Sequence, residues 1–79
     1  MNENIVFGKL VGLYADDFGN LTKVFYDEYE ESITIVQYLM KGRYLRRVGM
    51  ITILSKSEAE VILNTLKRYK NKLIDLRNK

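Results

Sequence analysis

The feature that most constrains the fold is a change in the spacing of apolar residues near position 55. From Ile5 to Leu54, apolar residues largely alternate with others at the two-residue period of a β-strand. From Lys56 onward they recur every three to four residues, which is the period of an amphipathic α-helix. We therefore expect several strands followed by one helix.

Turn residues divide the first part of the chain into four strands. The chain contains no proline, so Gly, Asn and Asp supply the turns. Short turns between consecutive strands favour antiparallel neighbours. The sequence predicts an α+β fold, a four-stranded antiparallel meander followed by one helix (ββββα), as a single domain over residues 1–79. The predicted strands are Ile5–Ala15, Leu21–Tyr29, Ile33–Met40 and Tyr44–Leu54.

Glycines and alternation give further expectations within these strands. Gly8 and Gly12 predict a bulge or a close approach of another element in the first strand. Strict alternation in the fourth strand places apolar and basic side chains on both faces. We expect Leu45, Arg47, Gly49, Ile51 and Ile53 on one face, and Arg46, Val48, Met50 and Thr52 on the other.

The helix has a clear start signal and a long apolar stripe. Ser55 and Glu58 have the spacing of a capping box, and the 3-4 pattern predicts a helix from Lys56 to Arg77. Such a helix is ~33 Å long, whereas four strands span only ~15 Å. We expect the stripe to cover its own sheet near Ala59–Leu66. The predicted dimer interface is Leu66, Tyr69, Leu73 and Leu76.

The absence of cysteine and histidine limits the chemistry of the chain. Disulfides, thiolate nucleophiles, histidine-ligated metals and a Ser-His-Asp triad are all excluded. The sequence therefore predicts a protein that is not an enzyme and that has no cofactor and no metal site. The alternatives that stay open are a Mg²⁺ site built from carboxylates alone and a hydrolase or nuclease that uses only carboxylates and Lys. A domain of 79 residues without these supports often gains stability by self-association, so we expect a homodimer.

The apolar runs are too short for a membrane helix. The longest, Val48–Leu54, is far below the ~20 residues required, and the polar residues at the N-terminus do not resemble a signal peptide. We expect a cytoplasmic protein without a membrane partner.

Charge is unevenly distributed along the chain. Residues 1–31 hold seven acids and two lysines, a net charge of −5, whereas residues 32–79 hold eleven Lys/Arg and three acids, a net charge of +8. This asymmetry favours an anionic partner. The alternative is that the two halves lie side by side in the fold and neutralise each other.

The basic residues gather in two segments. Four cations lie between Lys41 and Arg47, and no acid occurs from Ser32 to Ser57. Arg and Lys neutralise phosphates and aromatic rings stack on bases, so this composition favours single-stranded nucleic acid. The alternative is a solvated turn whose cations prevent edge-to-edge aggregation. The predicted contact residues are Tyr38, Lys41, Arg43, Tyr44, Arg46 and Arg47 on the strands, and Lys67, Arg68 and Lys70 on the helix.

An acidic stretch, Asp27–Glu31, supports a second hypothesis. It lacks the spacing of a calcium loop, so a solvated loop is the simpler interpretation. It could also dock on a basic protein. In that case the chain is a small protein-interaction module, for instance a viral or plasmid-encoded regulator, that dimerises through its helix and docks on a host protein.

One segment resembles a known family. The stretch from Arg46 to Ser55, Arg-Arg-Val-Gly-Met-Ile-Thr-Ile-Leu-Ser, follows the strand Ile33–Tyr38 and precedes the capped helix. This arrangement is similar to the PC4-like family of transcriptional coactivators, which bind single-stranded DNA. Val48 and Met50 depart from the family pattern. The resemblance covers residues 33–66 and implies a homodimer whose sheet faces bind single strands, with contacts from Arg43, Tyr44, Arg46 and Arg47.

Overall fold

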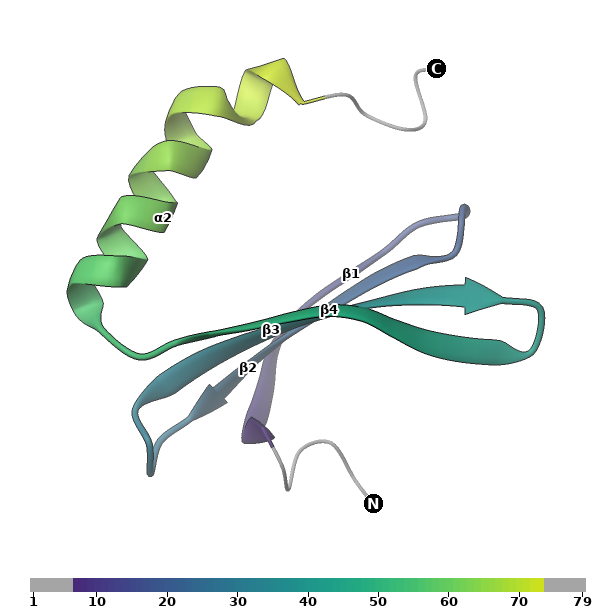
Figure 1. The fold of residues 1–79 in the computed structure, drawn as a ribbon, viewed down its shortest axis with the longest axis horizontal. Helices are drawn as coiled ribbons and strands as arrows, with labels where there is room; N and C mark the ends of the chain where they lie inside the picture. The colour runs from purple at the N-terminus through teal and green to yellow at the C-terminus, as the bar shows by residue number, and fades with distance from the viewer. Residues whose placement is uncertain (1–6, 74–79) are drawn as a thin grey trace.

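The structure, a computed structural model, describes residues 7–73 and consists of one sheet and one helical arm (Figure 1). The four strands are antiparallel, and their order in the sheet is their order in the chain. The predicted ββββα fold is confirmed. The elements are β1 (Lys9–Ala15), β2 (Asn20–Asp27), β3 (Ser32–Lys41), β4 (Tyr44–Ile53), α2 (Lys56–Tyr69) and a 3₁₀ turn, η1 (Lys70–Lys72).

The second strand is shorter than predicted because an aspartate ends it. Asp27 Oδ1 accepts hydrogen bonds from the backbone N–H groups of Tyr29, at 2.9 Å, and Glu30, at 3.2 Å. An Asp side chain that binds the backbone two and three residues ahead forms a turn in place of the strand ladder. Glu31 completes the turn with a positive φ of 54°.

The sheet has an inner face, which carries the core, and an outer face. Phe25, Val36 and Tyr38 form the buried cluster on the inner face, with Phe7 and Leu21 packed against it. The rings of Phe7 and Phe25 are 5.4 Å apart, centroid to centroid. The outer face carries the alternate residues of the same strands. In β2 and β3 these are Asn20, Thr22, Val24, Tyr26, Ile33, Ile35, Gln37, Leu39 and Lys41.

Bulges shift the alternation in both edge strands. The register breaks between Leu10 and Gly12, which confirms the bulge predicted from the glycines of the first strand. A second break lies where Gln37 pairs with Gly49 and Tyr38 with Arg47, so Val48 has no partner. One extra residue moves every following side chain to the other face.

The predicted faces of β4 are therefore wrong in its first half. Leu45 and Arg47 lie opposite Met40 and Tyr38, on the inner face. Arg46 lies opposite Leu39, on the outer face together with Ile51 and Ile53. A single sequence gives no sign of which residue is left unpaired, so strict alternation assigned Arg46 and Arg47 to the wrong faces.

The helix begins as predicted and ends early. The Ser55 side chain accepts the backbone N–H of Glu58 at 3.1 Å, and the Glu58 carboxylate accepts the backbone N–H of Leu54 at 3.3 Å. The α-helix stops at Tyr69, where η1 takes over, and Leu73 is extended. The predicted helical continuation through Leu73 is wrong, and residues 74–79 lie outside the described residues. Asn71 and four neighbouring cations weaken this last segment, and no packing compensates.

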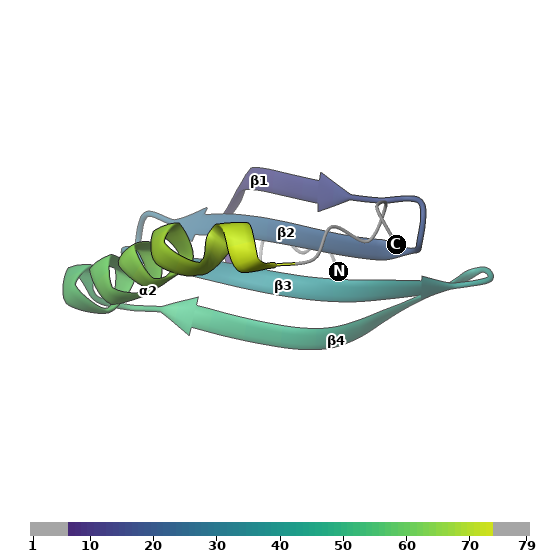
Figure 2. The same ribbon diagram turned by 90° about the horizontal axis from the view of Figure 1, so that it is seen from above.

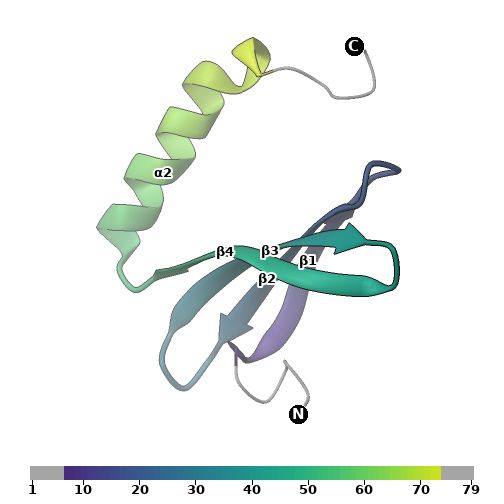
Figure 3. The same ribbon diagram turned by 45° about the vertical axis from the view of Figure 1, so that its right-hand side comes forward.

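The helix also stands away from its sheet, contrary to expectation. Figures 1 and 3 show α2 leaving the end of β4 and rising above the sheet as a separate arm, and Figure 2 shows the same arrangement from above. No residue of α2 is buried, and in its stripe only Ala59 and Ile62 are half-buried. The radius of gyration is 14.1 Å, against about 12 Å for a compact chain of this length. Within one chain, the helix residues Ala59–Leu66 therefore do not form the core that was predicted for them.

No helix among residues 7–73 is both long and apolar enough to cross a bilayer.

Candidate nucleic-acid interface

The turn between β3 and β4 presents the exposed basic segment. Lys41 pairs with Tyr44 at the last rung of the ladder, and Gly42 and Arg43 form the turn. Gly42 has a φ of 62°, the left-handed conformation that glycine adopts without steric cost. Tyr44 directly after the turn is 80 % exposed, which leaves its ring open to a ligand.

We call Lys41, Arg43, Arg46 and Arg47 the hairpin cations. All four side chains are exposed, and none forms an ion pair with any residue in the part of the chain that is described. Arg46 projects from the outer face and Arg47 from the inner face, as the register requires. The hairpin therefore carries positive charge on both faces of one end of the sheet.

The predicted turn between β1 and β2 lies at this end too, but its exposed ring was not among the predicted contact residues. The backbone N–H of Met40 donates to the Gly19 carbonyl at 2.8 Å, which ties the β1–β2 turn to the end of β3. Phe18 in that turn is 56 % exposed. The predicted meander already places the β1–β2 and β3–β4 turns at one end of the sheet, but the prediction considered only the basic segment and its neighbouring tyrosines. The structure thus adds a second exposed ring at the basic end.

Asp16 organises the β1–β2 turn. Its carboxylate accepts hydrogen bonds from the Phe18 backbone at 2.9 Å, from the backbone and side chain of Asn20, and from the Tyr14 hydroxyl at 3.0 Å. Desolvation raises the pKa of Asp16, but the hydrogen bonds outweigh it, so the pKa lies below its ordinary value of 3.8. Asp16 is therefore a charged structural group at neutral pH.

Tyr38 is buried, unlike the other predicted contact residues. It is 7 % exposed in the inner core, and the Lys23 ammonium lies 5.4 Å from its ring centroid. A base has little ring surface to stack on in this arrangement. The contact predicted for Tyr38 stays a prediction, and Tyr44 has the exposed ring that stacking requires.

The helical cations are separated from the hairpin in one chain. Lys67 and Arg68 are in the last turn of α2, and Lys70 and Lys72 are in η1. The helix starts at the end of β4 opposite the β3–β4 turn (Figure 1). Within one chain the two predicted basic segments therefore do not form one continuous surface.

The side chains of the predicted dimer interface that the structure describes are exposed to solvent. Leu66 is 54 % exposed, Tyr69 47 % and Leu73 70 %, whereas Leu76 lies outside the described residues. Leu66 and Tyr69 share the stripe with the half-buried Ala59 and Ile62.

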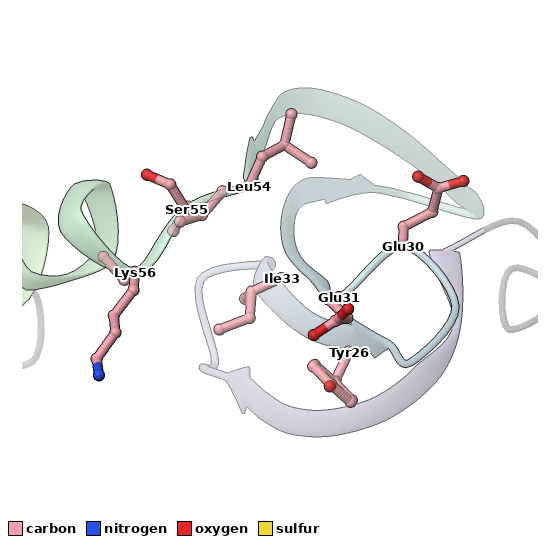
Figure 4. A pocket seen from close by; sticks show the side chains of 9 residues that line it. Tyr26, Glu30, Glu31, Ile33, Leu54, Ser55 and Lys56 are labelled. Atoms are coloured by element: carbon pink, nitrogen blue, oxygen red, sulfur yellow. The ribbon is translucent and has the colours of Figure 1, made fainter.

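The opposite end of the sheet is acidic and hollowed. A cavity of about 510 Å³ lies between the β2–β3 turn and the start of α2, with Tyr26, Glu31 and Ile33 on one side and Ser55 and Lys56 on the other (Figure 4). The described residues contain no group of three acids positioned to hold a metal ion. Acidic and basic ends thus lie at the two ends of the same strands.

The comparisons with known proteins give no match, since no family model, curated protein or solved structure is similar enough to this chain. The resemblance to the PC4-like family therefore stays a prediction.

Proposed function

We propose that the protein is a small homodimeric nucleic-acid-binding protein that prefers single strands. The observation that carries this proposal is the β3–β4 turn, where four exposed cations, which form no ion pair within residues 7–73, flank in sequence a tyrosine that is 80 % exposed. Phosphates are the partner that such a cluster attracts most strongly, and each phosphate contact releases counterions.

Tyr44 is the reason to favour single strands over duplexes. Its ring needs an unpaired base to stack on, and such stacking contributes about 1–3 kcal/mol per base. Phe18 at the same end of the sheet offers a second apolar ring. A duplex buries its base faces in its own stack and would use only the cations.

A second copy of the chain accounts for the exposed apolar surface of the helix. The stripe of α2 is apolar but uncovered at Leu63, Leu66 and Tyr69. Apolar surface of this kind marks a protein interface, and a two-fold pairing would cover the same surfaces in both chains. The dimer would bring two hairpins and two sets of helical cations into one assembly.

The test is a fluorescence-anisotropy titration of labelled single- and double-stranded oligonucleotides at two salt concentrations. Wild-type protein is expected to bind single strands more tightly, and Tyr44→Ala to weaken that binding by about 5- to 150-fold. Tyr29→Ala is the matched control, since Tyr29 is 93 % exposed in the acidic turn at the other end. Absence of binding at low salt would overturn the proposal.

A second candidate function rests on the acidic turn. Tyr29 is almost fully exposed between Glu28 and Glu30, and an aromatic side chain within an acidic loop can anchor a basic protein surface. In that case the chain is a regulator that docks on a host protein. Co-purification of one partner that resists nuclease and is lost in Tyr29→Ala would favour this function over the first.

A further inference from the structure

An uncharged polar side chain interrupts the apolar part of the outer face of β3. The outer-face positions of this strand are Ile33, Ile35, Gln37, Leu39 and Lys41, and the three apolar residues are half-buried. Gln37 is exposed, and its amide makes no hydrogen bond within residues 7–73. A β-branched residue would suit a central strand better, so packing gives no reason for Gln37.

The neighbours of Gln37 leave its amide uncovered. Thr22 on β2 lies on one side, and Gly49 on β4 lies on the other. A Cβ atom at Gly49 would stand 3.3 Å from Gln37 Oε1. Because Gly49 has no side chain, the Gln37 amide lies over the Gly49 backbone and remains exposed to solvent.

The Gln37 amide is on the same face as Arg46, one of the hairpin cations. Arg46 pairs with Leu39, the next outer-face residue of β3 after Gln37, and the bulge at Val48 lies between Arg46 and Gly49. Tyr14 pairs with Thr22 and is 54 % exposed at the other end of the same row. The outer face therefore carries the cation of Arg46, the exposed amide of Gln37 and the exposed ring of Tyr14.

We propose that the single strand crosses the outer face at Gln37 and that the amide of Gln37 hydrogen-bonds the edge of a base. This inference rests on the proposed function and adds base recognition to it. Arg46 holds a phosphate, and the base attached to that nucleotide reaches the Gln37 amide where it lies exposed over Gly49. The amide offers one acceptor and two donors, which complement the donors and acceptors on base edges.

The experiment compares binding to four homopolymeric single-stranded oligonucleotides, one for each base, and to an abasic strand of equal length. Wild-type protein is expected to bind the four bases with affinities that differ by about 2- to 10-fold, as one neutral hydrogen bond allows. All four are expected to bind more tightly than the abasic strand. Gln37→Ala is expected to remove the differences among the bases and to leave the salt dependence unchanged.

Two further variants separate recognition from folding. Gly49→Ala needs no unusual backbone angle and places a methyl group against Gln37 Oε1, so it is expected to remove the base preference in a stably folded protein. Asn64→Ala, which removes an exposed amide from α2, is the matched control and is expected to keep the preference.

The failures of the two proposals are distinguishable. If wild-type protein binds no strand, the proposed function fails together with this inference. If it binds single strands but does not distinguish the bases, or if Gln37→Ala and Gly49→Ala keep the preference, only the role of Gln37 is overturned.

Discussion

Gly19 occupies the most constrained position among the turns of the described chain. Its φ is 91°, and a Cβ atom there would lie 2.7 Å from the Met40 carbonyl oxygen. The hydrogen bond from Met40 N to Gly19 O holds this close approach. Gly42 also has a positive φ, of 62°, but nothing lies within 4 Å of its missing Cβ. A side chain at Gly42 would therefore meet backbone strain alone, whereas a side chain at Gly19 would meet both backbone strain and a steric clash.

We predict that Gly19→Ala destabilises the protein more than Gly42→Ala. The left-handed conformation alone costs about 1–2 kcal/mol, which is the loss expected for Gly42→Ala. Gly19→Ala adds the clash with Met40, for a total of about 2–4 kcal/mol. Urea unfolding of both variants measures the difference, and equal losses would show that the β1–β2 turn can move away from β3.

Asp16 gives the fold a pH dependence in acid. The pKa of Asp16 is below 3.8 in the folded protein, so the folded state binds its proton less tightly than the unfolded chain does. Its contribution to stability is complete above the unfolded pKa and is lost as the pH falls through the folded pKa.

Asp16→Asn is therefore expected to reduce the fall in stability below about pH 4. The measurement is the free energy of unfolding of both proteins at pH 3 and pH 7. Asp17→Asn, in the same turn, is the control and is expected to retain the wild-type pH dependence. A wild-type pH dependence in Asp16→Asn would contradict the hydrogen-bonded role of this carboxylate.

At the scale of elements, local signals predicted the strands and the helix start, because turn residues and caps act over a few positions. The Ser55 cap and the alternation of β2 and β3 are confirmed. The phase of β4 was wrong, since the unpaired Val48 is set by pairing with β3. The helix end was also wrong, because amphipathic spacing persists past Tyr69 where no packing supports it.

The candidate site could likewise be predicted only where its residues are neighbours in the sequence. The hairpin cations and Tyr44 are contiguous in sequence, so a composition argument was enough to find them. Phe18 was not found, because the prediction considered only the basic segment and its neighbouring tyrosines. Gln37 was not found, because its relevance depends on which strand lies beside it. Tyr38 was named as a surface ring and is in the core, since either face of β3 could have been the buried one.

The stripe of α2 gives a prediction about assembly. We expect wild-type protein to sediment at twice the chain mass of 9.3 kDa, and Leu66→Glu to shift it to the monomer, because a carboxylate on the stripe would be buried without a partner. Asn64→Glu places the same charge on the opposite side of the helix and is expected to remain dimeric. A monomeric wild-type protein would contradict the role assigned to the helix.

At the scale of the whole molecule, the strands separate two charged ends. The acidic turn and its cavity lie beside the start of α2, and the hairpin cations lie at the far end of β3 and β4. Asp16 and Asp17 of the β1–β2 turn lie at the hairpin end, so the separation of the two charges runs along β3 and β4 and not across the whole sheet. This polarity predicts that a polyanion contacts the hairpin end and avoids the acidic end.

The salt dependence of single-strand binding tests this account most directly. Removing two phosphate contacts is expected to lower the slope of log K against log salt by about 1.4 in magnitude. We predict this change for the double variant Arg43→Ala, Arg46→Ala. The double variant Lys9→Ala, Lys56→Ala removes the same charge near the acidic end and is expected to keep the wild-type slope. Equal slopes for both double variants, or no binding by wild-type protein at low salt, would contradict the account.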